Sequence, residues 1–97
     1  MRSMEQKRQL ETLAIVTNRF NSQYRLEKYG KREAFVTPSG TIFNVCAFPE
    51  EYALVIEYAE NAQEAMEGRF EDGDRFYLDE YNDYDQLIEA MRKEIGA

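Results

Sequence analysis

The chain contains no histidine and only one cysteine, Cys46, and these two shortages exclude several classes of function. Without histidine, the usual ligand set for zinc or copper is missing, so we expect no metal site. A serine or cysteine nucleophile would have no histidine base, and Cys46 lies in an apolar, β-prone run where we expect a packed, unreactive thiol. A single cysteine also cannot form an internal disulfide, so we expect a fold that does not depend on an oxidising compartment.

Long apolar runs and glycine clusters are missing as well. No run approaches the ~18–20 residues that span a bilayer, and the N-terminal segment lacks the apolar core of a secretion signal. We therefore expect a cytoplasmic protein that does not engage a membrane. The five glycines are scattered singly, so the sequence offers no glycine-rich phosphate loop, and we expect no cofactor.

Carboxylates are abundant, yet they match no recognised site. If Asp72 is taken as the first position of an EF-hand loop, Tyr77 falls where glycine is required and Asp83 falls where a bidentate glutamate is usual. Two carboxylates can also catalyse hydrolysis, but among so many acidic residues every spacing can be found. We therefore expect that the protein is not an enzyme.

The charge is distributed unevenly along the chain. Residues 1–48 carry eight Lys or Arg against four Glu, a balance of +4, whereas residues 49–97 carry four Lys or Arg against fifteen Asp or Glu, a balance of −11. Direct binding of nucleic acid needs basic side chains that replace condensed cations, so this acidic chain is not expected to bind it. The expected partner is a basic protein surface, or the basic half of the chain itself.

The N-terminal segment has the pattern of an amphipathic helix. Ser3 and Gln6 have the spacing of a capping box, and apolar residues follow at helical intervals. We expect a helix over residues 4–21. The residues predicted to face the core are Leu10, Leu13, Ala14, Thr17 and Phe20.

The next segment changes to the alternation that is typical of strands. Residues 24–29 and 31–37 flank Gly30 and predict a hairpin. Pro38–Gly40 predicts the following turn, because proline presets the first turn position and glycine tolerates positive φ. The strands on either side of this turn are expected to be antiparallel neighbours.

Two further strands are predicted after this turn. Residues 41–48 form the most β-prone run and carry little charge, so we place them centrally in the sheet. Residues 52–59 predict a fourth strand with Leu54 and Ile56 pointing inward. The alternative is a helix over residues 49–66, but consecutive aliphatic residues flanked by tyrosines favour the strand.

The C-terminal third predicts two helices. Asn61 and Glu64 repeat the capping spacing before a short helix, and Asp72–Gly73 predicts a turn before a brief extended segment over 75–78. Asp83 is expected to cap a final amphipathic helix. The predicted fold is a single α+β domain over residues 1–97, with an N-terminal helix, a three- to four-stranded antiparallel sheet and two C-terminal helices packed on the sheet.

Glutamates recur through the start of the acidic half at intervals of three, four, three and four. On a helix this spacing would align them in one stripe, with carboxylates ~6 Å apart along the axis, which is comparable with the charge spacing of a nucleic-acid backbone. We interpret the stripe either as a solvated face or as a surface that imitates a phosphate strand. Its members are Glu57, Glu60, Glu64, Glu67 and Glu71.

Aromatic rings are interleaved with the carboxylates that follow. We expect Phe70 and Phe76 to be core residues, whereas Tyr77, Tyr81 and Tyr84 can present a polar tip to water. Exposed tyrosine beside carboxylate suits a surface that receives Arg or Lys, through ion pairs and cation–π contacts. The candidate partner-binding residues are Glu60, Glu64, Glu67, Glu71, Asp72, Asp74, Tyr77, Asp79, Glu80, Tyr81 and Asp83.

The C-terminal half also carries a resemblance, in the segments VIEYA (55–59), FEDGDRF (70–76) and MRKEI (91–95). It resembles a small acidic orphan protein carried on conjugative transposons and prophages of Gram-positive gut bacteria, which implies a mobile-element setting and no particular activity. The order of elements and the acidity are also similar to those of small anti-CRISPR inhibitors, which implies engagement of a nuclease's nucleic-acid channel. That second similarity is one of fold alone and implies no residue roles.

These observations favour a non-enzymatic acidic binding protein of mobile-element origin. We expect it to engage a basic protein surface, encoded by the host or the element, as a DNA mimic or inhibitor. The alternative is an assembly module that forms a homodimer or larger homo-oligomer when its basic and acidic halves meet in neighbouring copies. Charge-held assemblies should dissociate as salt shortens the Debye length of ~8–10 Å.

Overall fold

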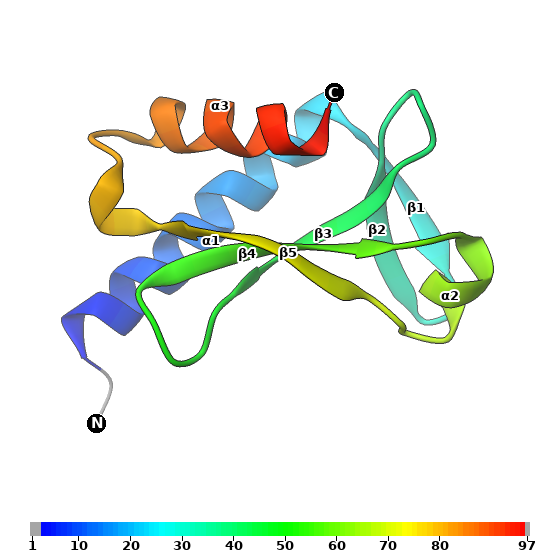
Figure 1. The fold of residues 1–97 in the computed structure, drawn as a ribbon, viewed down its shortest axis with the longest axis horizontal. Helices are drawn as coiled ribbons and strands as arrows, with labels where there is room; N and C mark the ends of the chain where they lie inside the picture. Colours follow the sequence, from blue (N-terminus) through cyan, green and yellow to red (C-terminus); the bar gives the residue numbers. More distant parts are fainter. Residues whose placement is uncertain (1–2, 97) are drawn as a thin grey trace.

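The chain forms an α+β fold with a five-stranded antiparallel sheet, seen in a computed structural model that describes residues 3–96 (Figure 1). The N-terminal helix comes first, a short helix interrupts the strands, and a third helix ends the chain. The elements are α1 (Met4–Gln23), β1 (Arg25–Tyr29), β2 (Arg32–Val36), β3 (Ile42–Ala47), β4 (Ala53–Ala59), α2 (Ala62–Met66), β5 (Glu71–Tyr77), the 3₁₀ turn η1 (Leu78–Glu80) and α3 (Tyr84–Ile95).

The sheet is a meander in which each strand pairs with the next along the chain, in the order β1-β2-β3-β4-β5. β3 lies at the centre, as predicted from its composition. Its register with β4 runs over six residue pairs, from Ile42–Ala59 to Ala47–Leu54. Its register with β2 covers two pairs, and Figure 1 shows the β1–β2 hairpin turned away from the three other strands.

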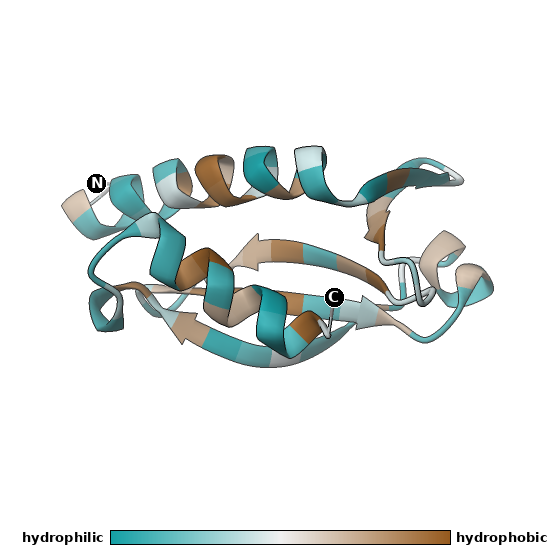
Figure 2. Cartoon of the chain, turned by 90° about the horizontal axis from the view of Figure 1, so that it is seen from above, coloured by the Kyte–Doolittle hydropathy of each residue, from teal (hydrophilic) through white to brown (hydrophobic). Residues whose placement is uncertain are grey.

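One face of the sheet carries the main core beneath α1 and α3, which lie side by side over it (Figure 2). Strand residues alternate between the two faces, so Leu54 and Ile56 both point to this side, as predicted, and neither is exposed. Burying a side chain of this kind stabilises the fold by roughly 1.5–3 kcal/mol. The fully buried large side chains are Phe20, Phe43, Leu54, Ile56, Met91 and Val16.

Aromatic packing joins the end of α1 to the sheet. The Phe20 ring packs edge-to-face on Tyr24, Phe35 and Phe43, with centroids 5.4, 6.2 and 5.9 Å away. Such pairs add about 0.5–1.5 kcal/mol each beyond the area that they bury. This cluster fixes the point where α1 ends and β1 begins.

The other face of the sheet is covered at one end by α2. Ala65 of α2 packs with Ala34, Val36, Ile42 and Ala59, which alternate with residues of the main core. The two C-terminal helices therefore lie on opposite faces of the sheet. Among residues 3–96, no helix is long and apolar enough to cross a membrane.

The prediction of which residues of α1 face the core is wrong, because the helix is rotated about its own axis. Phe20 is buried and Leu13 is half-buried, but Leu10, Ala14 and Thr17 are exposed. The helix is rotated because Gln9 is buried, where its Nε2 donates to the carbonyls at the β3–β4 turn. The buried residues of α1 are Gln9, Thr12, Val16 and Phe20.

The turn predicted at Asp72–Gly73 is also wrong, because both residues lie inside β5. A Cβ added to Gly73 would lie 2.7 Å from the Tyr58 ring and 3.0 Å from the Ile56 carbonyl oxygen. Glycine at this position admits a close neighbour and does not mark a turn. The extended segment predicted over 75–78 is thus the end of a longer fifth strand.

The three predicted signals for the start of a helix are present in the structure. Ser3 and Gln6 form a complete capping box, and the side chains of Asn61 and Asp83 accept the backbone N–H of Glu64 and Gln86. These contacts set where the three helices begin.

Candidate functional site

The glutamates do not form a helical stripe. Glu57 lies in β4, Glu60 in the bend after it, and Glu71 in β5. Glu64 lies in α2, which spans only five residues, and Glu67 is its C-cap. The prediction fails because the Asn61 cap and Gly68, at a φ of +73°, confine the helix to little more than one turn.

Part of the predicted site comes together in a hollow between β4, α2 and β5, which we call the acidic hollow. Its volume is about 680 Å³. Four of its lining residues are carboxylates that the sequence singled out, and two are aromatic. The lining consists of Tyr58, Glu60, Glu64, Arg69, Phe70, Glu71 and Asp72.

Arg69 neutralises one side of the acidic hollow. Its guanidinium lies 3.7 Å from Glu64 and 3.3 Å from Glu67. Glu60, Glu71 and Asp72 are exposed, and none of the ion pairs within residues 3–96 includes them. Three carboxylates of the hollow thus have no ion-pair partner among the described residues, beside the half-buried ring of Phe70.

A second group of predicted residues lies at the opposite end of β5. Tyr81 and Asp83 line a hollow of about 480 Å³ between η1, α3 and the N-terminal half of α1. Asp83 already accepts the backbone N–H of Gln86 at 2.8 Å, which caps α3. Burial, followed by the nearby charge of Glu80, raises the pKa of Tyr81. The other lining residues are Arg8, Glu11, Thr12, Tyr52, Leu78, Asn82, Tyr84 and Leu87.

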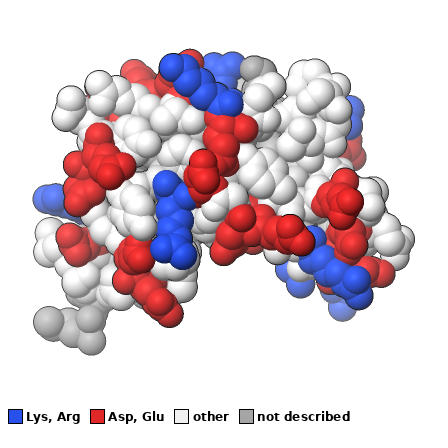
Figure 3. Space-filling model, in the orientation of Figure 1, with Lys and Arg blue, Asp and Glu red and all other residues white. Residues whose placement is uncertain are grey.

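The remaining candidates lie outside both hollows. Asp74 and Tyr77 belong to β5 between them, and the backbone N–H of Asp74 donates to Glu94 at 2.9 Å. Asp79 and Glu80 are exposed on η1. Figure 3 accordingly shows the visible carboxylates in separate groups with basic side chains between them, and not as one continuous acidic face.

The sheet surface next to the acidic hollow contains the single cysteine. Cys46 is half-buried, and burial, followed by the negative charge of Glu57, raises the pKa of its thiol to about 12. The thiol is therefore protonated near neutral pH and is a poor nucleophile. Within residues 3–96, no group of three or more His, Cys, Asp or Glu side chains is arranged to hold a metal ion.

Sequence reasoning missed the contacts that fix this half of the molecule. Tyr58 and Glu94 join β4 to α3 through a hydrogen bond between their side chains. They are thirty-six positions apart in the sequence, so no local spacing could reveal the pair. The burial of Gln9 was missed for the same reason.

No family model, no curated protein and no solved structure matches the chain.

Proposed function

We propose that the chain is a non-enzymatic binding protein that engages a basic surface of another protein through its acidic hollow. The observation that carries the proposal is the convergence of Glu60, Glu71 and Asp72, which form no ion pair within residues 3–96, around one concavity beside Phe70. A guanidinium or ammonium group entering the hollow would meet carboxylates and an aromatic ring together.

The charge distribution supports a protein partner over nucleic acid. The residues from 49 onward carry a net charge of −11, which repels phosphate and attracts Lys-rich or Arg-rich surfaces. A surface that normally holds nucleic acid has this character, so the protein would act as a mimic or an inhibitor of such a partner. The mobile-element origin belongs to this proposal and rests on the residue pattern of the C-terminal half alone.

The proposed role of the acidic hollow is tested by reversing the charge of Glu60, Glu71 and Asp72. In the variant E60K/E71K/D72K, partners eluted by rising salt from a low-salt bacterial lysate should be lost. The control variant E5K/E11K/E50K makes the same change in net charge at exposed positions outside the hollow. Mass spectrometry of the eluates compares the two variants with the native chain.

Two results would contradict the proposal. If the native chain and the hollow variant retain the same proteins, the hollow is only a solvated surface. If the control variant loses them equally, net charge alone explains the retention. Circular dichroism of each variant must first show that the fold is intact.

Self-assembly is the second candidate, and the opposite charges of the two sheet edges favour it. The β1–β2 hairpin carries four basic and two acidic residues, and β5 carries three acidic residues and one basic residue. These edges lie at opposite ends of the strand order, so neighbouring copies could pair β5 with β1. Light scattering across a salt series checks this: salt-sensitive oligomers would support assembly, and a monomer at low salt would exclude it.

A further inference from the structure

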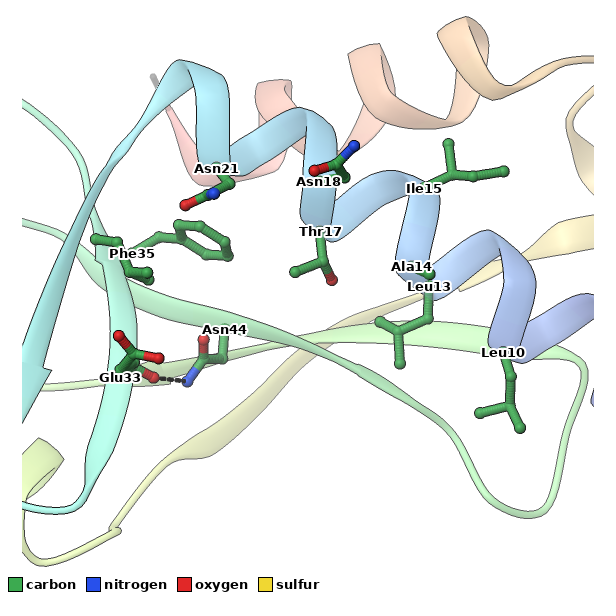
Figure 4. A pocket seen from close by; sticks show the side chains of 11 residues that line it. Leu10, Leu13, Ala14, Ile15, Thr17, Asn18, Asn21, Glu33, Phe35 and Asn44 are labelled. Atoms are coloured by element: carbon green, nitrogen blue, oxygen red, sulfur yellow. Dashed lines mark hydrogen bonds between the residues drawn. The ribbon is translucent and has the colours of Figure 1, made fainter.

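A groove runs along α1 on the side where it faces β1, β2 and β3. Its volume is about 870 Å³, and Figure 4 shows Leu10 and Leu13 extending from α1 toward β3. Leu10 and Leu26 remain 44% and 42% exposed in it. The groove is lined by Leu10, Leu13, Ala14, Ile15, Thr17, Asn18, Asn21, Leu26, Glu33, Phe35 and Asn44.

The groove opens where β2 separates from β3. The register between these strands stops at Phe35–Phe43. A continued register would pair Ala34 with Asn44 and Glu33 with Val45, but neither pair forms. Instead, the side-chain amide of Asn44 donates to the Glu33 carbonyl oxygen at 3.0 Å (Figure 4). Asn44 thus satisfies a backbone group that a longer ladder would have used, and the strands diverge beyond it.

The divergence leaves one edge of β3 open. Alternate residues of a strand direct their backbone groups to opposite neighbours. The backbone N–H of Phe48 donates to β4 at Ala53, so the backbone groups of Asn44 and Cys46 also face β4. Those of Val45 and Ala47 face the side that β2 has left, next to Asn44, which is the β3 residue in the groove lining. Within residues 3–96, the register with β2 does not continue beyond Phe43, so Val45 and Ala47 have no partner strand on that side.

The charge of the groove is defined by one residue. Glu33 is its only charged lining residue, and the ion pairs within residues 3–96 do not include it. Lys28 is its cross-strand neighbour, yet no ion pair joins them. The complement of the groove lining is therefore apolar along α1 with a positive group beside Glu33, while the basic Lys28 and Arg32 of the same hairpin lie outside the lining.

We propose that the groove binds an extended segment of a partner protein, which adds a short strand to the open edge of β3. The segment would exchange backbone hydrogen bonds with Val45 and Ala47, place an apolar side chain against Leu10 and Leu13, and set a Lys or Arg beside Glu33. A helix would not use this edge, because its backbone groups are bonded internally. This site is separate from the acidic hollow, and either can fail without the other.

A display library of random short peptides, selected on the folded full chain, tests the proposal. Enriched peptides should share alternating apolar residues with one Lys or Arg. Ala14→Arg places a long side chain in the groove from an exposed helix position and should weaken their binding by about tenfold or more. Glu11→Gln, on an exposed residue outside the groove, changes the net charge equally and should leave binding unchanged.

Two further readouts identify the mode of binding. Hydrogen exchange followed by NMR should show the amides of Val45 and Ala47 becoming protected when an enriched peptide binds. Glu33→Lys should reverse the charge preference of the selected peptides. The proposal is overturned if no peptides are enriched, if Ala14→Arg retains them, if they bind as helices, or if the chain fills the groove by self-association.

Discussion

The phenol of Tyr58 on β4 donates a hydrogen bond to Oε2 of Glu94 on α3, with the two oxygens 2.5 Å apart. The other carboxylate oxygen of Glu94 accepts the backbone N–H of Asp74 on β5 at 2.9 Å. One carboxylate therefore ties α3 to the last two strands. Because Tyr58 also lines the acidic hollow, the same pair holds one wall of the proposed binding site in place.

Replacing Tyr58 with phenylalanine should weaken this connection. The substitution removes a donor to a carboxylate, so we expect the free energy of unfolding at neutral pH to fall by about 1 kcal/mol. The phenol's hydrogen bond lowers the pKa of Glu94, so that pKa should rise further in Y58F. Chemical denaturation and an NMR titration of the Glu94 carboxyl measure the two effects.

Tyr52→Phe is the matched control, because no hydrogen bond of the Tyr52 phenol occurs within residues 3–96. It should change stability much less than Y58F. An equal loss in both variants would show that the Tyr58–Glu94 bond contributes nothing specific.

The pH dependence of stability should carry the signature of Glu94. Burial raises its pKa above the ordinary value of 4.5. The folded state therefore holds this proton more tightly than the unfolded state does, so the stabilisation is complete below pH 4.5 and is lost as pH rises through the folded-state pKa. In Glu94→Gln this loss disappears.

The measurement is urea denaturation of both proteins across a pH series. The free energy of unfolding of the native chain, minus that of E94Q, should decrease as pH rises from 4.5. Subtraction removes the contributions of the other carboxylates, provided that they are independent of Glu94. A difference that grows with pH would contradict the direction of the shift.

Gln9 should be among the most sensitive positions of α1. Its Nε2 lies 2.7, 3.0 and 2.6 Å from the carbonyl oxygens of Phe48, Glu51 and Ala53, and its two hydrogens can serve two of them at a time. Gln9→Ala leaves the Phe48 carbonyl without its donor, which should cost about 1–3 kcal/mol, whereas the Glu51 and Ala53 carbonyls still accept backbone N–H groups. Gln23→Ala, at the exposed end of the same helix, is the control, and similar midpoints in urea for both variants would exclude this role.

The sequence predicted the features whose causes are local. The caps at Ser3 and Asp83 and the turn at Pro38–Gly40 depend on residues within a few positions, and each marks a real boundary. The inward residues of β4 followed from alternation along one strand. The composition of β3 likewise predicted its central place in the sheet.

The features that it missed depend on residues far apart in the chain. The rotation of α1 follows from the contacts of Gln9 with a turn about forty positions away. The three-four spacing of glutamates indicated a helix, but the chain divides them between strands, a bend and one short helix. For the acidic hollow, the sequence could predict only that the segments around it are rich in carboxylates. It could not predict the hollow itself, because its walls meet through the pairing of β4 with β5.

Gly73 should resist substitution because of its neighbour and not because of its backbone. A Cβ would lie 2.7 Å from the Tyr58 ring, so Gly73→Ala should displace that ring and cost about 1–3 kcal/mol. Gly40→Ala is a useful contrast, since nothing lies within 4 Å of its Cβ and its φ of +94° is the only source of strain. If G73A has native stability, or if its Tyr58 signals do not shift in NMR spectra, the close approach is not limiting.

The open edge of β3 predicts an alternating exchange pattern in the unbound protein. Asn44 and Cys46 direct their amides to β4 in the sheet interior, so these amides should exchange slowly. Val45 and Ala47 direct theirs to the side that β2 has left, so they should exchange faster although they lie in the same central strand. Native-state hydrogen exchange by NMR gives all four rates in one experiment.

Uniformly slow exchange would mean that the edge is already covered and that β3 has no backbone groups to offer a partner strand. Fast exchange at Val45 and Ala47 alone would mean that the central strand carries an unsatisfied edge, which a binding protein can use.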